Sequence, residues 1–201
     1  MNDISTLSAL HAEDDPAELT LSLLIALSSH TLGASPLAGK MLGLVNLGGA
    51  AAEVARRAAA ALEMTAQSFD AEPGAGVQGA VRQVAWADLL ETSDYLVVGG
   101  EAKADLSPMI SAGDFNRMKP GACLITIGEP ENVDQLALIN ALWFETIGGA
   151  ALALKSIPLV LRTQFGECPN AVIWPGLPVN DISVWYGQDT QTGTARPRLV
   201  A

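Results

Sequence analysis

Short apolar runs alternate along the chain with segments whose apolar residues recur at helical spacing. The runs predict strands at Met41–Asn46, Thr65–Phe69, Val81–Val84, Tyr95–Val98, Ala122–Ile127, Ile147–Leu154 and Ala171–Trp174. The intervening segments predict helices at Ala50–Met64, Trp86–Thr92, Met109–Met118 and from the cap Asp134 to about Phe144, with Leu136, Ile139, Ala141 and Leu142 inward. Strands that alternate with helices predict an α/β fold, a doubly wound parallel sheet of the Rossmann type in three layers.

A further helix is predicted at Ala17–Ser29, where Pro16 suits the first turn. Its sequence, AELTLSLLIALSS, is apolar on nearly every side, so we expect the helix to be buried on more than one face. Two interpretations are open. The helix forms the interface of a homodimer, or it covers part of the sheet of its own chain.

The length of 201 residues and the hydrophobic content of 49% fit a single domain with a full core. We expect an N-terminal lead at residues 1–16, a Rossmann-like domain at 17–180 and a C-terminal tail at 181–201. The tail is polar and interrupted by Pro and Gly from Gly187 onward, so it is predicted to be flexible.

The turn after the first strand resembles a dinucleotide-binding signature. Against the pattern G-x-G-x-x-G/A, the three defined positions hold Asn46, Gly48 and Ala51. Asn departs from the pattern, but after Gly it is the residue that best tolerates a positive φ. Asp70 lies 22 positions after Gly48, close to the spacing expected for a carboxylate that binds the adenine ribose. A carboxylate there favours NAD over NADP.

The same residues have a simpler interpretation, in which the unit is kept for packing and Gly48 and Gly49 only make the turn. Gly49 also weakens the start of the helix, because glycine loses more backbone freedom than other residues.

Charge and cysteine content narrow the possible functions. The net charge of −11 argues against a nucleic-acid or anionic-membrane partner. The chain shows no apolar run long enough for a membrane span and no signal-peptide pattern at its start, so we expect a cytoplasmic protein. Cys123 and Cys168 match no metal or redox spacing. Cys123 is expected to be an inert core thiol, and Cys168 is placed in a loop.

A characteristic order of segments runs along the chain: AELTLSLLIALSS, LAGKMLGLVNLGGAAAEVARRAA, DLLETSDYLVV, FNRMKPGACLITIG, VDQLALINALW, IGGAALAL and PNAVIWPG. In this order the segments resemble the nucleotide-binding domain of the D-isomer-specific 2-hydroxyacid dehydrogenases, from about Ala17 to Pro175. The resemblance implies a Rossmann-type domain and a dimer that forms near the Ala17–Ser29 helix. Members of the family also have a substrate domain, which we expect to be absent here because the chain starts close to that helix.

The resemblance also locates three departures. Glu129 stands where the family has a catalytic Arg, and a Glu would repel the substrate carboxylate that Arg holds. Gly176 replaces the catalytic His, and Pro158 stands where the partner Glu of that His is expected. Lys155 is interpreted as a solvated loop lysine. Hydride transfer from a 2-hydroxy acid needs a base and a cation, so ordinary dehydrogenase turnover is not expected.

The resemblance implies where NAD would lie. The amides of Gly48, Gly49 and Ala50 would hold the pyrophosphate, and Gly49 stands where the family often has an Arg. The other predicted cofactor positions are Asn46, Asp70, Gly99, Gly100, Ile127 and Gly128. We expect weak NAD(H) binding; the alternatives are a non-catalytic dimeric scaffold without cofactor and, with less support, an enzyme of another class that uses Glu101, Glu129 or Cys168.

Overall fold

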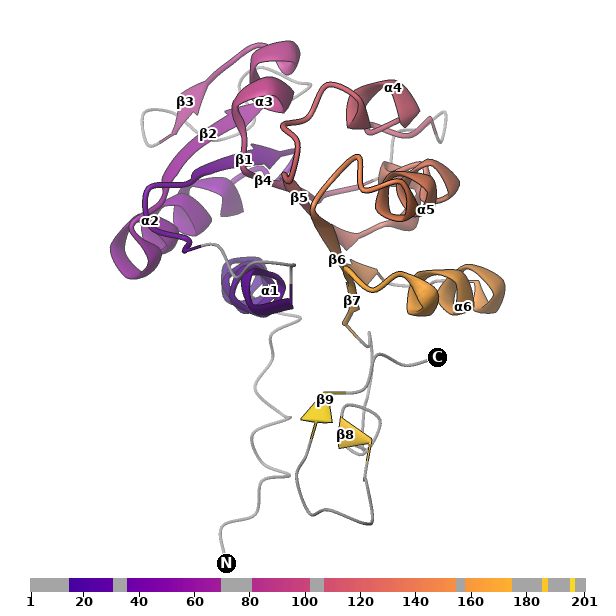
Figure 1. The fold of residues 1–201 in the computed structure, drawn as a ribbon. Coiled ribbons are helices and arrows are strands. Elements are labelled where there is room, and N and C mark those ends of the chain that lie inside the picture. Colours follow the sequence, from indigo (N-terminus) through magenta and orange to yellow (C-terminus); the bar gives the residue numbers. More distant parts are fainter. Residues whose placement is uncertain are drawn as a thin grey trace, which may run out of the picture.

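The computed structural model describes residues 15–30, 36–69, 81–101, 107–154 and 158–174, and the backbone of 186–187 and 196–197 (Figure 1). Its helices are α1 (Pro16–His30), α2 (Ala50–Leu62), α3 (Trp86–Thr92), α4 (Ala112–Phe115), α5 (Gln135–Trp143) and α6 (Leu159–Glu167), with a 3-10 turn η2 (Pro130–Asn132). Its strands are β1 (Met41–Val45), β2 (Thr65–Phe69), β3 (Arg82–Gln83), β4 (Tyr95–Val98), β5 (Cys123–Gly128), β6 (Gly149–Leu154), β7 (Ala171–Ile173), β8 (Tyr186–Gly187) and β9 (Arg196–Pro197).

The first seven strands form one sheet in the order β3-β2-β1-β4-β5-β6-β7, and all of its pairs are parallel. The strand order reverses between β1 and β4, which lie side by side in the sheet although β2 and β3 separate them in sequence. In such a fold, ligands bind at this switch point, beyond the carboxyl ends of the strands. The predicted doubly wound parallel sheet is therefore confirmed.

Each face of the sheet is covered by helices. Leu42 and Leu44 of β1 pack in a core layer with α1 and α2, whereas Leu96 and Val98 of β4 belong to the opposite layer, beneath α3, α4, α5 and α6. Figure 1 shows α1 and α2 together on one side of the sheet. The alternation of side chains along each buried strand thus produces the three predicted layers.

The helix α1 is buried largely against its own chain. Asp15 caps it, since its Oδ1 accepts hydrogen bonds from the amides of Ala17 (2.9 Å) and Glu18 (3.3 Å). The helix packs on α2 and on β5, β6 and β7, and Arg57 of α2 forms an ion pair with Asp15 at 2.8 Å. Its apolar surface is therefore used within the chain, but Ile25 stays 51% exposed.

Two predictions around the later helices were wrong. Met109–Met118 is not one helix: Ile110 forms a parallel bridge with Val133, and only α4 is helical. A capping box sets the start of α4, because Ser111 and Asp114 satisfy each other's backbone amides. Leu136, expected inward, is 60% exposed.

The segment after β6 contains α6, a helix that the sequence pattern did not predict. Cys168, which we placed in a loop, is the C-cap of this helix and is fully buried. In the predicted tail, β8 and β9 pair antiparallel. The N-terminal lead, except residues 15 and 16, and the rest of the tail lie outside the described residues.

Candidate functional site

The carboxyl ends of three neighbouring strands bring most of the predicted cofactor positions together. In the parallel register Val45 pairs with Val98, and Val98 pairs with Thr126. The residues that follow these positions therefore share one edge of the sheet, at the switch point. They are Asn46 and Gly48 after β1, Gly99 and Gly100 after β4, and Ile127 and Gly128 at the end of β5. Asp70 lies outside the described residues.

Asn46 makes the turn that leaves β1. Its φ is +53°, the left-handed region in which Asn is tolerated, and Gly48 follows with φ +52°. The Asn46 amide donates to the Phe69 carbonyl of β2 at 3.3 Å. Its side-chain Nδ2 donates to the Glu101 carbonyl at 3.3 Å, so it links the ends of β1 and β4. The departure from glycine thus keeps the turn and adds a contact across the switch point.

The start of α2 has the form of an anion cradle. Gly49 is the N-cap and has no side chain to cap the helix, and a Cβ placed on it would meet nothing within 4 Å. Ala50 and Ala51 donate to the carbonyls of Leu47 (3.1 Å) and Gly48 (3.2 Å). The amides of Gly48 and Gly49 have no acceptor in the described part of the chain. Free amides and the positive end of the helix dipole favour an anion here.

The glycines after β4 permit a close approach to the turn after β1. Gly100 has φ +78°, and a Cβ there would overlap the carbonyl oxygen of Asn46 and lie 2.7 Å from its Nδ2. A Cβ on Gly99 would lie 2.5 Å from Cδ2 of Leu47. Gly100 requires glycine, because its φ is positive and the atom in the way is backbone. At Gly99 the atom in the way is the end of the Leu47 side chain, which can move.

Asn132 is a component of the site that sequence reasoning missed. Its side chain is 1% exposed, and its Nδ2 donates to the carbonyls of Gly100 (3.0 Å) and Gly99 (3.3 Å). Its Oδ1 has no hydrogen-bond partner among the described residues. Asn132 therefore fixes the peptide groups at the end of β4 from a turn that follows β5. The sequence offered one sign of this role, namely an Asn two positions before Asp134, the predicted cap of the next helix.

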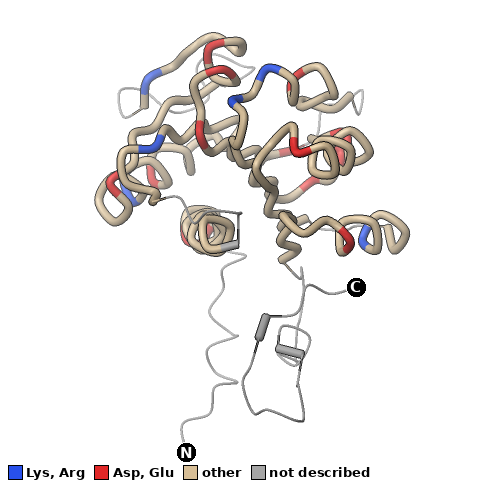
Figure 2. Tube along the Cα trace, in the orientation of Figure 1, with Lys and Arg blue, Asp and Glu red and all other residues tan. Residues whose placement is uncertain are grey.

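Acidic residues flank this edge. Glu101 is exposed after Gly100, and Glu129 is half-buried directly after β5. Among the other described residues, acidic positions lie both on helices and in the turns between elements (Figure 2). Of the other positions tied to catalysis, Pro158 is the exposed N-cap of α6, whereas Lys155 and Gly176 lie outside the described residues.

Neither cysteine is suited to act as a nucleophile. Burial raises the pKa of Cys123 to about 12, and burial also raises the pKa of Cys168. Since the thiolate is the reactive form, both side chains are inert core thiols at neutral pH. This confirms the expectation for Cys123 and removes Cys168 as a candidate group for other chemistry.

Comparison with known proteins places this geometry in a family. The family model of the D-isomer specific 2-hydroxyacid dehydrogenase NAD-binding domain matches residues 26–176. A glycerate dehydrogenase of Methylorubrum extorquens is 34% identical over 114 residues, which are 57% of this chain and 34% of that protein. A 4-methyl-2-oxopentanoate reductase A of Aspergillus oryzae is 30% identical over 145 residues, 72% of this chain and 44% of that protein.

Solved structures agree on the fold. The TT0316 protein of Thermus thermophilus has a TM-score of 0.68 at 25% identity, covering 79% of this chain and 56% of that one. The D-lactate dehydrogenase of Lactobacillus jensenii, solved with NAD+, has a TM-score of 0.69 at 19% identity, covering 83% and 59%. The chain spans less than half the length of the curated relatives it matches. No helix in the described ranges is both long and apolar enough to cross a membrane.

Proposed function

The chain belongs to the D-isomer specific 2-hydroxyacid dehydrogenase family through its NAD-binding domain, the domain for which the expected cofactor is NAD, and we propose that it binds NAD(H) weakly without ordinary dehydrogenase turnover. The observation that carries this proposal is the combination of an open cradle at Gly48 and Gly49 with an acid, Glu129, after β5. The first is what a pyrophosphate needs, and the second opposes a carboxylate substrate.

The residues at the switch point fit the cofactor. The amides of Gly48 and Gly49 would hold the pyrophosphate, and Asp70 would hold the adenine ribose. The peptide groups of Gly99, Gly100, Ile127 and Gly128 would form the wall of the crevice. When bound, NAD supplies the group that accepts a hydride.

Binding is weak in this proposal because the charges oppose it. Gly49 offers no guanidinium to the phosphates, where the family often has an Arg. Glu101 and Glu129 add negative charge near the crevice, and the whole chain carries −11. An anionic ligand therefore gains no electrostatic attraction over distance.

Turnover fails in this proposal because the proton acceptor and the carboxylate clamp are missing. The only histidines in the sequence are His11 and His30, and neither stands in the motif that supplies the family's base. A side chain at position 129 would have to attract the substrate carboxylate, and Glu repels it. The positions of the His and its acidic partner hold Gly176 and Pro158.

A charge series at Gly49 tests the cofactor site. Calorimetric titration with NAD, NADH and NADPH should show saturable binding of NAD and NADH to the wild type. Gly49→Arg should bind roughly tenfold more tightly, the gain from one charge-assisted phosphate contact, and Gly49→Asp should abolish binding. Ala60→Arg and Ala60→Asp, on the exposed last turn of α2, change the net charge equally and should leave affinity unchanged.

The same titration decides between cofactor binding and the scaffold alternative. The contact that Asn46 makes across the switch point favours the scaffold. If the wild type and Gly49→Arg both fail to bind millimolar nucleotide, the cofactor proposal is wrong and a scaffold role gains support. NADH oxidation in the presence of 2-oxo acids tests turnover separately. Oxidation at a rate typical of dehydrogenases, on the order of 1 s⁻¹ or faster, would contradict the proposed loss of catalysis.

The assembly proposed here is a cytoplasmic homodimer formed through α1. Ile25, a large apolar side chain of this helix that stays 51% exposed, supports it. Light scattering should give twice the chain mass of 20.9 kDa for the wild type. Ile25→Asp should give the monomer mass, whereas Ser29→Asp, exposed at the end of the same helix, should remain dimeric. A monomeric wild type would refute the proposal.

A further inference from the structure

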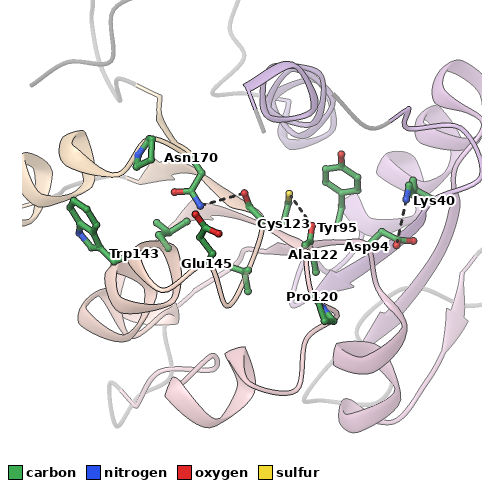
Figure 3. Close-up of a pocket in the computed structure, with 14 residues that line it drawn as sticks. Lys40, Asp94, Tyr95, Pro120, Ala122, Cys123, Trp143, Glu145 and Asn170 are labelled. Carbon is green, nitrogen blue, oxygen red and sulfur yellow. Dashed lines mark hydrogen bonds and ion pairs between the residues drawn. The ribbon is translucent and has the colours of Figure 1, made fainter. Parts of the chain in front are cut away.

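A cavity of about 500 Å³ lies at the amino edge of the sheet, the edge opposite the switch-point crevice (Figure 3). It is lined by residues that directly precede or begin the strands β1, β4, β5, β6 and β7, together with the end of α5. Its volume is within the range of small-molecule sites. The proposed cofactor site and the family's reaction lie at the opposite edge, so neither explains this cavity.

At one end of the cavity, two lysines surround a single carboxylate. Lys40 Nζ lies 3.9 Å from Asp94 Oδ1, and Lys119 Nζ lies 3.2 Å from the same oxygen. Asp94 Oδ2 accepts a hydrogen bond from the Met41 amide at 2.8 Å. The carboxylate is thus fully engaged, and two lysines share it. This end has a surplus of positive charge and disfavours a cation.

The other end presents acceptors without matching donors. Asn170, 6% exposed, donates from Nδ2 to the Gly148 carbonyl at 3.4 Å, and its Oδ1 has no partner in the described part of the chain. Glu145, an exposed carboxylate, lines the same cavity. Figure 3 shows Asn170, Glu145 and Trp143 grouped away from Lys40 and Asp94. A buried acceptor without a donor is costly unless a ligand supplies one.

An aromatic face and a helix end add to the preference for positive charge at this place. Trp143, the last residue of α5, lines the cavity and is 51% exposed. An indole face attracts cations through its quadrupole. The carboxyl end of a helix carries partial negative charge, and α5 ends here because helices of this fold run opposite to the strands.

We propose that this cavity binds a small organic ammonium, with the cationic group among Trp143, Glu145 and Asn170. The ammonium N–H groups donate to the exposed Glu145 carboxylate, and the charge lies against the indole. Asn170 Oδ1 is closed to solvent in the free protein, and a turn of this side chain toward the ligand provides a second acceptor. The uncharged body of the ligand extends over the apolar lining, which includes Ile147, Ala122 and Pro120. The site is independent of the cofactor crevice and does not rest on the proposed function.

Phenethylammonium is the probe, because it joins a primary ammonium to a compact apolar body. Titration of the full chain, followed by calorimetry and by saturation-transfer NMR, should show saturable binding at millimolar concentration or below. Two ligands of similar shape are controls, the neutral 2-phenylethanol and the anionic phenylacetate. Both should bind more weakly, by about two- to fivefold from the loss of one cation–π contact at an exposed site alone. Equal binding of all three would mean that the cavity does not select a cation, and would overturn the proposal.

Matched variants locate the site. Trp143→Ala should weaken phenethylammonium binding about two- to fivefold or more, whereas Phe144→Ala, an adjacent aromatic that is 80% exposed and outside the cavity, should not. Glu145→Gln should weaken binding, whereas Glu131→Gln, an exposed acid on η2, should not. Absence of binding to the folded wild type, or equal effects within each pair, would overturn the proposal.

Discussion

The side-chain amide of Asn46 donates to the backbone carbonyl of Glu101 at 3.3 Å and joins the two strands between which the sheet reverses its order. One residue therefore performs two tasks at the crevice. Its backbone takes the left-handed conformation that the turn requires, and its side chain holds the segment that follows β4. Substitutions can separate the two tasks.

Asn46→Ala should lower the free energy of unfolding by about 1–2 kcal/mol, since Ala has no easy access to φ +53°. Asn46→Gly should change it by less than about 0.5 kcal/mol, because glycine adopts this conformation freely and the lost hydrogen bond is solvent-exposed. Urea denaturation at neutral pH measures both. Equal losses in the two variants would mean that the side-chain contact, and not the backbone conformation, determines the cost.

Gly100→Ala should destabilise the protein by about 2–3 kcal/mol or more. The new methyl group would overlap the Asn46 carbonyl, at a φ of +78° that non-glycine residues rarely adopt. Gly113→Ala is the matched control, because it lies in α4 with nothing within 4 Å of the added carbon. It should stabilise by about 0.5–1 kcal/mol. Midpoints of urea unfolding compare the two, and a Gly100 variant as stable as the wild type would refute the close approach.

Acid should weaken α2 through Glu53. Hydrogen bonds from Arg56 and Arg57 lower the pKa of this carboxyl from 4.5 to about 2. A lowered pKa in the folded state contributes stability above pH 4.5 that is lost as the pH falls toward 2. The contribution is small and screened by salt, because the group is at the surface.

Urea midpoints recorded through this acid range should fall less steeply for Glu53→Gln than for the wild type. Glu131→Gln, at an exposed acid on η2, should keep the wild-type slope. Identical slopes for all three proteins would show that the guanidinium contacts of Glu53 do not contribute to folding.

The two thiols should react only after unfolding. Burial raises the pKa of Cys123 to about 12 from a value of 9.0, so the folded chain disfavours its thiolate. Stability from this group is complete below pH 9 and is lost as the pH rises toward 12. A thiol-specific chromogenic reagent at about pH 8 should label neither cysteine in the native protein and both in concentrated urea. Fast labelling of Cys168 in the folded state would contradict its complete burial.

The periodic apolar runs predicted the sheet well because its central strands are buried on both faces. Every residue of β4 and β6 is buried, so these runs have no polar interruption that would confuse the pattern. The turn at Asn46, Gly48 and Gly49 was also accessible, since local sequence sets its conformation.

The features that were missed depend on contacts between distant segments. In α6 a single buried side chain, Phe165, faces the core, while Leu159 and Val160 are exposed, so no helical period is visible. The segment before α4 is extended because Ile110 pairs with Val133, more than twenty positions away. The capping box of Ser111 and Asp114 was the local signal that marked the true start.

The donor that fixes the Gly99 and Gly100 carbonyls, Asn132, comes from a turn that lies beyond the next strand. The segment after β4 and the η2 turn therefore depend on each other and cannot be exchanged independently. In a chimaera that joins this chain up to β4 with a relative from β5 onward, the residue that the relative holds at the η2 turn decides whether these carbonyls keep a donor. A crevice transplanted into another scaffold must therefore include the η2 turn.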